Sequence, residues 1–151
     1  MIKIIAVGNI KETYLKEAID EYKKRLSKYT ALEIIEIKEE NDAETNKNIR
    51  LEGEKIEKCL NDKDYIITLE IEGKELSSIE FAEKIDKLQQ ESSNLVFIIG
   101  GSCGLAETIK NRSKFALSFS KMTFPHQLFR VILLEQIYRA FKIENNEAYH
   151  K

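Results

Sequence analysis

Three side chains at the C-terminus of the chain are suited to acid–base chemistry or to binding an anion. Tyr149, His150 and Lys151 place a phenol, an imidazole and a cation at consecutive positions. Imidazole changes its charge near neutral pH and can therefore accept a proton from a substrate. In most proteins, however, a polar terminal segment such as 144–151 is a solvated end of the chain. The segment alone does not decide between these two interpretations.

A glycine-rich loop further upstream is suited to binding a ligand through backbone groups. The apolar run LVFII at 95–99 predicts a buried strand, and Gly100, Gly101 and Gly104 follow it. Glycine has no Cβ, so its backbone can approach a ligand closely. The pattern GGSCG is neither G-x-G-x-x-G nor a phosphate loop, and it is equally compatible with a plain turn. No Asp or Glu lies around Lys121, about twenty residues further on, which disfavours classical NAD binding.

A second loop of this kind precedes the most apolar helix of the chain. Pro125 is the only proline, and His126 is one of two histidines. Proline suits the first turn of a helix, and it disfavours helical geometry at the residue before it, Phe124. We therefore expect an extended loop at 120–124 that leads to a helix N-terminus, where free N–H groups and a positive dipole suit a ligand.

The helix expected at 125–143 is apolar on almost every side. Such a helix is either central in the domain or packed in a subunit interface. Arg130 and Arg139 lie nine residues apart and so point in roughly opposite directions. An interface would allow Arg139 to reach a neighbouring subunit. The apolar residues of the helix are Phe129, Ile132, Leu133, Leu134, Ile137, Tyr138 and Phe141.

Composition and charge are those of a water-soluble protein with one domain, 1–151. No apolar run approaches the ~20 residues of a membrane span, and the N-terminus lacks a signal peptide's pattern. Cys59 and Cys103 fit no metal-ligand spacing, so we expect reduced thiols in the cytoplasm and no metal. The net charge is −2, but residues from 101 onward carry 8 Lys/Arg against 4 Glu, or +4. This basic end is compatible with local binding of RNA.

Apolar runs alternate with helical periodicity along the chain, which predicts an α/β fold with a mostly parallel sheet and helices on both faces. We expect the polar segment 38–48 to be a solvated loop, and the third strand to end at Gly73. The expected strands are 2–7, 32–37, 65–71, 95–99 and 115–119. The expected helices are 12–26, one within 39–64, one that begins at a Ser77–Glu80 capping box, a short one at 108–111, and 125–143.

Taken together and in order, four segments resemble the RlmH family of SPOUT-class 23S rRNA pseudouridine N3-methyltransferases. They are LEIEGK (69–74), FIIGGSCG (97–104), LSFSKMTFPHQLFRVILLEQIYRAF (117–141) and AYHK (148–151). Residues 4–26 fit the same family, so the resemblance covers essentially the whole chain. The acidic segment 38–64 is its least distinctive part.

The resemblance implies a C-terminal trefoil knot, a homodimer, and S-adenosylmethionine (AdoMet) as methyl donor. It implies 23S rRNA in the assembled 70S ribosome as the substrate, with no membrane and no metal involved. Cys103 is expected to be a small neutral filler of the glycine loop. Transferred position by position, the cofactor contacts of the family fall at Leu69, Gly101, Ser120, Lys121, Met122, Thr123, Phe124 and Pro125.

The resemblance also assigns Arg139, Tyr149 and His150 to methyl transfer. The acceptor is an imide nitrogen, which must lose its proton before or during the reaction. His150 could accept that proton, Arg139 could hold a phosphate or stabilise the charged base, and Tyr149 could stack on the target or hydrogen-bond to it. The sequence does not rank these roles or identify the general base.

Three other interpretations stay open from the sequence. One is another SPOUT-type RNA methyltransferase. A second is a different small-molecule enzyme on a doubly wound sheet, which would bind nucleotides rather than AdoMet. The third is a ribosome-binding protein without activity, which methyl transfer to rRNA would exclude.

Overall fold

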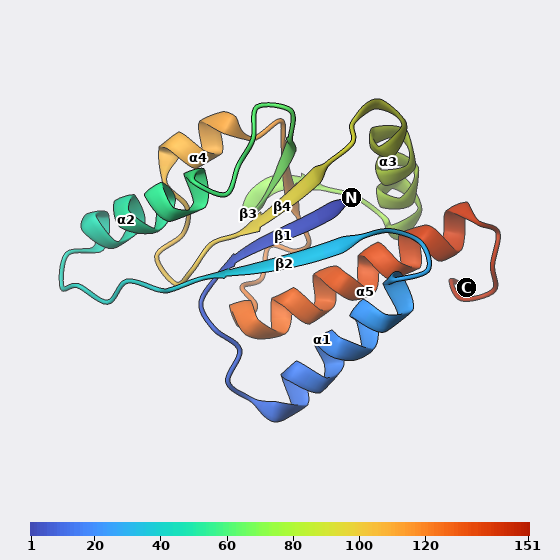
Figure 1. The fold of residues 1–151 in the computed structure, drawn as a ribbon, viewed down its shortest axis with the longest axis horizontal. Helices are drawn as coiled ribbons and strands as arrows, with labels where there is room; N and C mark the ends of the chain where they lie inside the picture. Colours follow the sequence, from blue (N-terminus) through green and yellow to red (C-terminus); the bar gives the residue numbers. More distant parts are fainter.

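The computed structural model describes all 151 residues, and its centre is a five-stranded, all-parallel sheet (Figure 1). The strand order is β2-β1-β4-β3-β5. The strands are β1 (Ile2–Val7), β2 (Leu32–Ile37), β3 (Tyr65–Glu75), β4 (Leu95–Ile99) and β5 (Phe115–Ser118). The helices are α1 (Thr13–Leu26), α2 (Thr45–Glu57), α3 (Ser78–Glu91), α4 (Glu107–Arg112) and α5 (His126–Glu144). The predicted α/β class is therefore confirmed.

Helices cover both faces of the sheet, which explains why its central strands are apolar without alternation. Ile2, Ile4 and Ala6 of β1 pack with α1, α3 and α5 in the larger core cluster. Ile5 and Val7 of the same strand pack with α2 and α4 in the smaller one. Successive side chains of a strand point to opposite faces, so a strand covered on both faces must be apolar at every position. All five residues of β4 are likewise buried.

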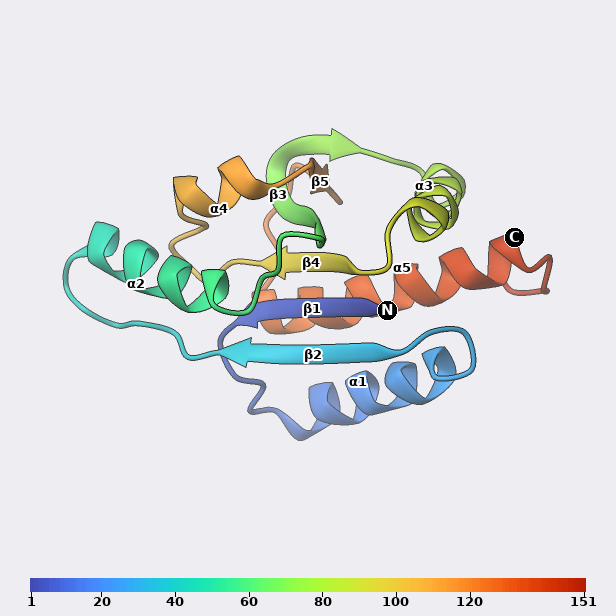
Figure 2. The same cartoon turned by 45° about the horizontal axis from the view of Figure 1, so that its top comes forward.

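Helix α5 lies in the larger layer between α1 and α3 (Figure 2). Seven of its residues are buried, and Ile137 is 0% exposed. Of the two placements open from the sequence, the central one is therefore confirmed, and the apolar character of Ile137 reflects the core of its own chain. The apolar side chains of α5 that remain accessible lie mainly along one stripe, which includes Leu128 and Ile132.

Arg130 fastens the first turns of α5 to the ends of two strands. Its side chain is 1% exposed. Nη1 donates to the Glu36 carboxylate at 2.6 Å, and Nη2 donates to the Gly8 carbonyl at 3.0 Å. The same carboxylate accepts the backbone N–H of Ile10 at 3.0 Å. Arg130 thus holds the carboxyl ends of β1 and β2 against α5, on the side of the helix opposite Arg139.

Strand β3 is longer than predicted and does not end at Gly73. It pairs with β5 at Leu69↔Leu117 and again at Lys74↔Leu117, so residues 70–73 form an irregular insertion in the ladder. A Cβ at Gly73 would lie 2.6 Å from the Ala116 carbonyl oxygen. The glycine therefore allows the two backbones to approach after the insertion, whereas the sequence pattern suggested a strand terminus.

The other boundaries agree with the sequence apart from small differences. The capping box of α3 is present, since Ser77 Oγ accepts from the Glu80 N–H at 3.1 Å and the Ser77 N–H donates to Glu80 at 2.8 Å. Helix α5 begins at His126, one residue later than expected, and Pro125 is its N-cap. The solvated loop expected at 38–48 is shorter, because α2 begins at Thr45 and Asn48 is buried within it. Segment 38–44 is a loop held against α2, since Glu52 accepts from the Glu40 N–H at 2.9 Å.

None of the helices has the length and apolar character that crossing a membrane requires.

The contact at Arg130 predicts a large loss of stability on substitution. Arg130→Met keeps most of the buried volume but leaves the Gly8 carbonyl and the Glu36 carboxylate without their partner. We expect the free energy of unfolding to fall by about 3 kcal/mol. Urea denaturation at a fixed protein concentration measures the change. The matched control is Arg50→Met on the exposed face of α2, which we expect to change stability by less than about 0.5 kcal/mol. Equal effects of the two variants would contradict this role for Arg130.

Candidate functional site

A cavity of about 890 Å³ opens at the carboxyl edge of the sheet, where ligands of parallel α/β proteins usually bind. Its walls come from the ends of β3, β4 and β5, the glycine loop, and the loop that enters α5. The lining residues are Leu69, Glu70, Ile71, Glu72, Ile99, Gly100, Gly101, Ser102, Gly104, Leu105, Lys110, Leu117, Ser118, Phe119, Ser120, Met122, Thr123, Phe124, Pro125, His126 and Phe129.

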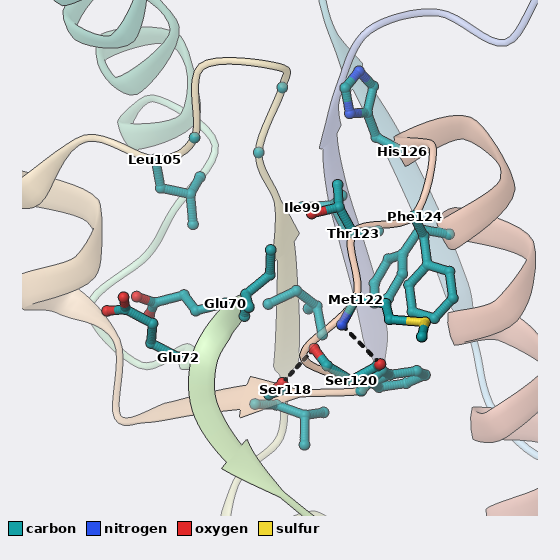
Figure 3. Close-up of a pocket in the computed structure, with 18 of the residues that line it drawn as sticks. Glu70, Glu72, Ile99, Leu105, Ser118, Ser120, Met122, Thr123, Phe124 and His126 are labelled. Carbon is teal, nitrogen blue, oxygen red and sulfur yellow. Dashed lines mark hydrogen bonds between the residues drawn. The ribbon is translucent and has the colours of Figure 1, made fainter.

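The cavity has one acidic side and one apolar side. Figure 3 shows Glu70 and Glu72 extending from β3 on the side of Leu105, while Met122 and Phe124 lie on the opposite side. Thr68 Oγ1 donates to Glu70 at 2.6 Å, and Lys110, which also lines the cavity, lies 3.9 Å from the other oxygen of that carboxylate. A cavity of this kind suits a ligand with both an apolar or aromatic part and a positively charged part.

The glycine loop lines the cavity and also packs closely against other residues of the chain. A Cβ at Gly101 would lie 2.9 Å from Val7 Cγ1, and one at Gly100 would lie 3.0 Å from Leu105 Cγ. Gly104 has a φ of +88°, in the region that favours glycine. The close approach expected at these glycines therefore already exists within the protein. Ser102 in the same loop donates from Oγ to Glu39 at 2.8 Å, which ties the loop to segment 38–44.

The loop between β5 and α5 is held by short-range hydrogen bonds. Ser118 Oγ donates to the Ser120 carbonyl at 3.1 Å, and Ser120 Oγ accepts from the Met122 N–H at 2.9 Å (Figure 3). No side chain caps the N-terminus of α5 at Pro125. The first N–H groups of α5 therefore lack a capping partner at the edge of the cavity.

Seven of the eight residues expected to contact a cofactor line this cavity, and the exception is Lys121. The side chain of Lys121 is exposed. The seven are Leu69, Gly101, Ser120, Met122, Thr123, Phe124 and Pro125.

The structure also brings together the three residues expected to act in methyl transfer, at the other end of α5. The Arg139 guanidinium lies 4.8 Å from the centre of the Tyr149 ring, and its Nη1 lies 3.1 Å from His150 Nδ1. Glu135 joins the group. It accepts from Arg139 Nε and Nη2, both at 3.1 Å, and from the Tyr149 hydroxyl at 2.8 Å. We refer to Glu135, Arg139, Tyr149 and His150 as the tail network.

The C-terminal tail is folded back along α5. Asn146 has a φ of +53°, a conformation that asparagine tolerates better than most residues, and it reverses the chain. The Glu147 carboxylate then accepts from the Tyr29 hydroxyl at 2.7 Å and pairs with Lys142 at 3.1 Å. These contacts lower the pKa of Glu147. The tail is thus held in place by hydrogen bonds, although its residues after Glu144 are exposed except for Tyr149.

Burial, and after it the hydrogen bond to Glu135, raise the pKa of Tyr149 to about 12. A phenol with this pKa stays protonated at neutral pH. Its hydroxyl hydrogen is engaged by Glu135, and its ring packs edge-on against Tyr138 at 5.0 Å. Tyr149 therefore serves within the tail network as a fixed donor to Glu135.

The cavity and the tail network are far apart within one chain. His126 lines the cavity, and Arg139 lies thirteen residues further along the same helix. A rise of 1.5 Å per residue separates these two positions by about 20 Å. Figure 1 shows the C-terminus beside the last turns of α5, at the opposite end of the helix from its first turn. One chain alone does not bring the two groups of residues together.

Sequence reasoning missed Glu135 and the acidic side of the cavity. The spacing of Glu135 and Arg139, four residues apart on a helix, is a signal for an ion pair that was available. No sequence pattern indicated Glu70 and Glu72, because their side chains reach the cavity through the irregular insertion in β3, which the sequence did not predict. No group of three or more His, Cys, Asp or Glu side chains is arranged to hold a metal ion.

Comparison with known proteins identifies the family. Residues 1–150 match the family model described as "Predicted SPOUT methyltransferase". The chain belongs to the SPOUT methyltransferase family. Within it, the chain is similar over its full length to proteins named ribosomal RNA large subunit methyltransferase H, which confirms the RlmH resemblance.

The similarity to these SPOUT relatives extends over nearly the whole length of both chains. Identity is 56% to the putative enzyme of Methanococcus vannielii, over 99% of each chain. It is 55% to the Clostridium botulinum protein over 99% of each chain, and 52% to the Caldicellulosiruptor saccharolyticus protein over 100% of each. A solved structure, a probable methylase family protein from Haemophilus influenzae, has a TM-score of 0.62 at 13% identity, over 99% of this chain and 70% of the other. That likeness supports the SPOUT fold alone.

The tail network predicts an unusual tyrosine titration. We expect one tyrosine to ionise near pH 12 and this transition to disappear in Tyr149→Phe. Glu135→Gln should lower the pKa of Tyr149 without restoring its usual value, since burial is the larger cause. Because the folded pKa is raised, the contribution of Tyr149 to stability is present below about pH 10 and is lost as the pH rises toward 12.

Near-ultraviolet absorbance of tyrosinate measures this titration. Glu54→Gln, which alters an exposed carboxylate of α2, is the matched control and should leave the curve unchanged. A Glu135→Gln curve identical to that of wild type would show that the hydrogen bond between Glu135 and Tyr149 does not form in solution.

Proposed function

We propose that the protein methylates N3 of a pseudouridine in 23S rRNA of the assembled ribosome, with AdoMet as the methyl donor. Membership of the SPOUT family and the names of the relatives support rRNA methyl transfer in general. The two groups of residues described above support the finer assignment, because the cavity suits a cofactor and the tail network suits an acidic ring nitrogen that must become an anion.

The cavity residues fit AdoMet in size and chemistry. A cavity of about 890 Å³ falls in the range of small-molecule sites. The apolar side formed with Phe124 would receive the adenine ring, and Glu70 and Glu72 would face the positively charged sulfonium and ammonium groups. When bound, AdoMet supplies an electrophilic methyl group, and the electrons of the broken C–S bond stay on sulfur. The proposed contacts are Leu69, Gly101, Ser120, Lys121, Met122, Thr123, Phe124 and Pro125, with Lys121 contributing through its backbone.

A homodimer with a trefoil knot in each chain is part of this proposal. The accessible stripe of α5, with Leu128 and Ile132, offers an apolar surface for a second copy. If two copies of α5 pack antiparallel about a two-fold axis near Ile132, residue 139 of one lies close to residue 126 of the other. The partner's tail network would then complete the cavity.

The observation that carries the proposal is the separation of about 20 Å between the cavity and the tail network along α5. A base held by the tail of one subunit meets a methyl donor in the cavity of the other only if the site is shared. Within such a site, closure around the ring nitrogen excludes water and aligns the reacting atoms, which can contribute several kcal/mol to catalysis.

Mass spectrometry of nucleosides from large-subunit rRNA tests the proposed reaction. Cells that contain the protein should yield N3-methylated pseudouridine, and cells without it should yield the unmethylated nucleoside at the same position. Identical nucleoside profiles from the two kinds of cell would refute the proposed reaction.

A bulky side chain at the mouth of the cavity should block AdoMet. Thr123 lines the cavity and is exposed, so that Thr123→Trp adds volume there without removing a core contact. We expect isothermal titration calorimetry to show at least a tenfold loss of AdoMet affinity. Ile79→Trp is the control, because Ile79 is 50% exposed and lies outside the cavity lining. Unchanged affinity in Thr123→Trp would place the cofactor elsewhere.

Mixed dimers test whether the site is shared. One subunit carries Thr123→Trp, which blocks its cavity, and the other lacks residues 149–151, which removes the tail. Each change should abolish methylation of ribosomes in the homodimer, while the truncation leaves AdoMet affinity nearly unchanged. In the mixed dimer we expect up to half of the wild-type activity, since the open cavity of the truncated subunit receives the intact tail of its partner. Purified mixed dimers without activity would mean that each tail serves its own cavity.

A further inference from the structure

His150 is held by a hydrogen bond that decides which of its ring nitrogens can face a substrate. Arg139 Nη1 lies 3.1 Å from His150 Nδ1. A guanidinium has donors only, so Nδ1 must be the acceptor in this pair. The ring proton of neutral His150 is therefore on Nε2. No contact within the chain engages Nε2, and the side chain of His150 is exposed.

The arginine is firmly placed, so the tautomer of His150 is fixed with it. Glu135 binds Arg139 through two hydrogen bonds of 3.1 Å, from Nε and Nη2. Such a bidentate pair defines the plane of the guanidinium and directs Nη1 to the histidine. The Tyr149 ring packs against the guanidinium, and its hydroxyl donates to Glu135. Glu135, Tyr149 and His150 thus all contact Arg139 or its partner carboxylate.

This geometry is unsuited to a general base. The nitrogen of His150 with a free lone pair, Nδ1, is already occupied by Arg139. If His150 took up a proton there, the new N–H would point at the guanidinium, with Lys151 as a further cation next in the chain. The Tyr149 hydroxyl is engaged by Glu135 and stays protonated at neutral pH. Neither His150 Nδ1 nor the Tyr149 hydroxyl is therefore free to accept the proton of the substrate.

We infer that His150 is a hydrogen-bond donor that stabilises the anionic form of the substrate base through Nε2–H. This inference rests on the proposed function. Before the site closes, the acceptor nitrogen gives its proton to solvent water or hydroxide and keeps the electron pair, and the negative charge spreads to the two adjacent carbonyl oxygens. The Nε2–H of His150 donates to one of these oxygens, and Arg139, paired with Glu135, holds the ring in the tautomer that allows this. Donors placed where charge develops contribute about 10²–10³ in rate.

A pair of substitutions separates a donor from a base. The amide of His150→Gln can donate where Nε2 did but cannot act as a base, while His150→Ala does neither. Single-turnover methylation of 70S ribosomes from cells without the protein, with AdoMet labelled in its methyl group, gives the rates. We expect His150→Gln to keep activity within about tenfold of wild type, and His150→Ala to lose about 10²–10³-fold. AdoMet affinity should be unchanged in both.

The outcomes are distinct from a failure of the proposed function. If wild type methylates rRNA and His150→Gln is as inactive as His150→Ala, the proton acceptor is His150 and the inference is overturned. If wild type transfers no methyl group to rRNA, the proposed function fails and the donor role fails with it.

Nitrogen NMR provides a readout that does not depend on catalysis. The chain has two histidines, so that His150→Gln assigns the signals of the ring nitrogens. Couplings between ring nitrogens and carbon-bound protons identify the protonated nitrogen in the folded, unliganded protein. We expect His150 to carry its proton on Nε2 alone, and Arg139→Met to allow a fraction of the Nδ1–H tautomer to appear. A proton on Nδ1 in the wild-type protein would contradict the inference.

Discussion

Helix α5 sets the geometry on which the rest of the molecule depends. It is buried along most of its length, it is a single rigid element, and it lies between α1 and α3 against the sheet. Its first residue lines the cavity, and its last turns carry the tail network. Arg130 fixes the beginning of the helix to the carboxyl ends of β1 and β2, with almost no exposure to water. The distance between the cavity and the tail network is therefore set by the core, and a small movement of a loop cannot change it.

The tail network shows how charges can be held in position near a surface. Surface ion pairs usually contribute little, because two flexible side chains lose entropy when they meet in water. Glu135 and Arg139 are each only 20–25% exposed, are four residues apart on the same helix, and meet through two hydrogen bonds. The helix has already fixed the backbone of both. Little further side-chain entropy is therefore lost when the pair forms. The pair can position His150 and Tyr149 without a large contribution to stability.

Much of the fold could be predicted because its signals are local. Continuous apolar runs at β1 and β4 indicate strands covered on both faces, and the Ser77–Glu80 pair indicates the start of α3. The strand order is not local, and neither is the insertion in β3, which exists because Gly73 lets two backbones approach beside β5. Gly73 therefore looked like a strand terminus when only its own neighbours along the chain were considered.

The same distinction applies to the candidate site. The loops at Gly101 and Pro125 were predicted from glycine and proline, whose backbone effects are independent of context, and both line the cavity. The sequence could not decide whether the apolar helix is central or at an interface, since an apolar residue such as Ile137 is expected in either place. Glu135 gained its importance only when the tail folded back over it.

The most direct test of the shared site is a distance measurement across the dimer. Spin labels would be attached at Thr123→Cys, beside the cavity, and at Lys151→Cys, at the tail, in a protein whose Cys59 and Cys103 are replaced by serine. With both labels in one chain of a mixed dimer, pulsed electron paramagnetic resonance should give a separation of at least about 20 Å, set by the length of α5. With the labels in different chains, the account predicts a clearly shorter separation. An interchain distance longer than the intrachain one, or no interchain coupling at all, would contradict the claim that two subunits build each site.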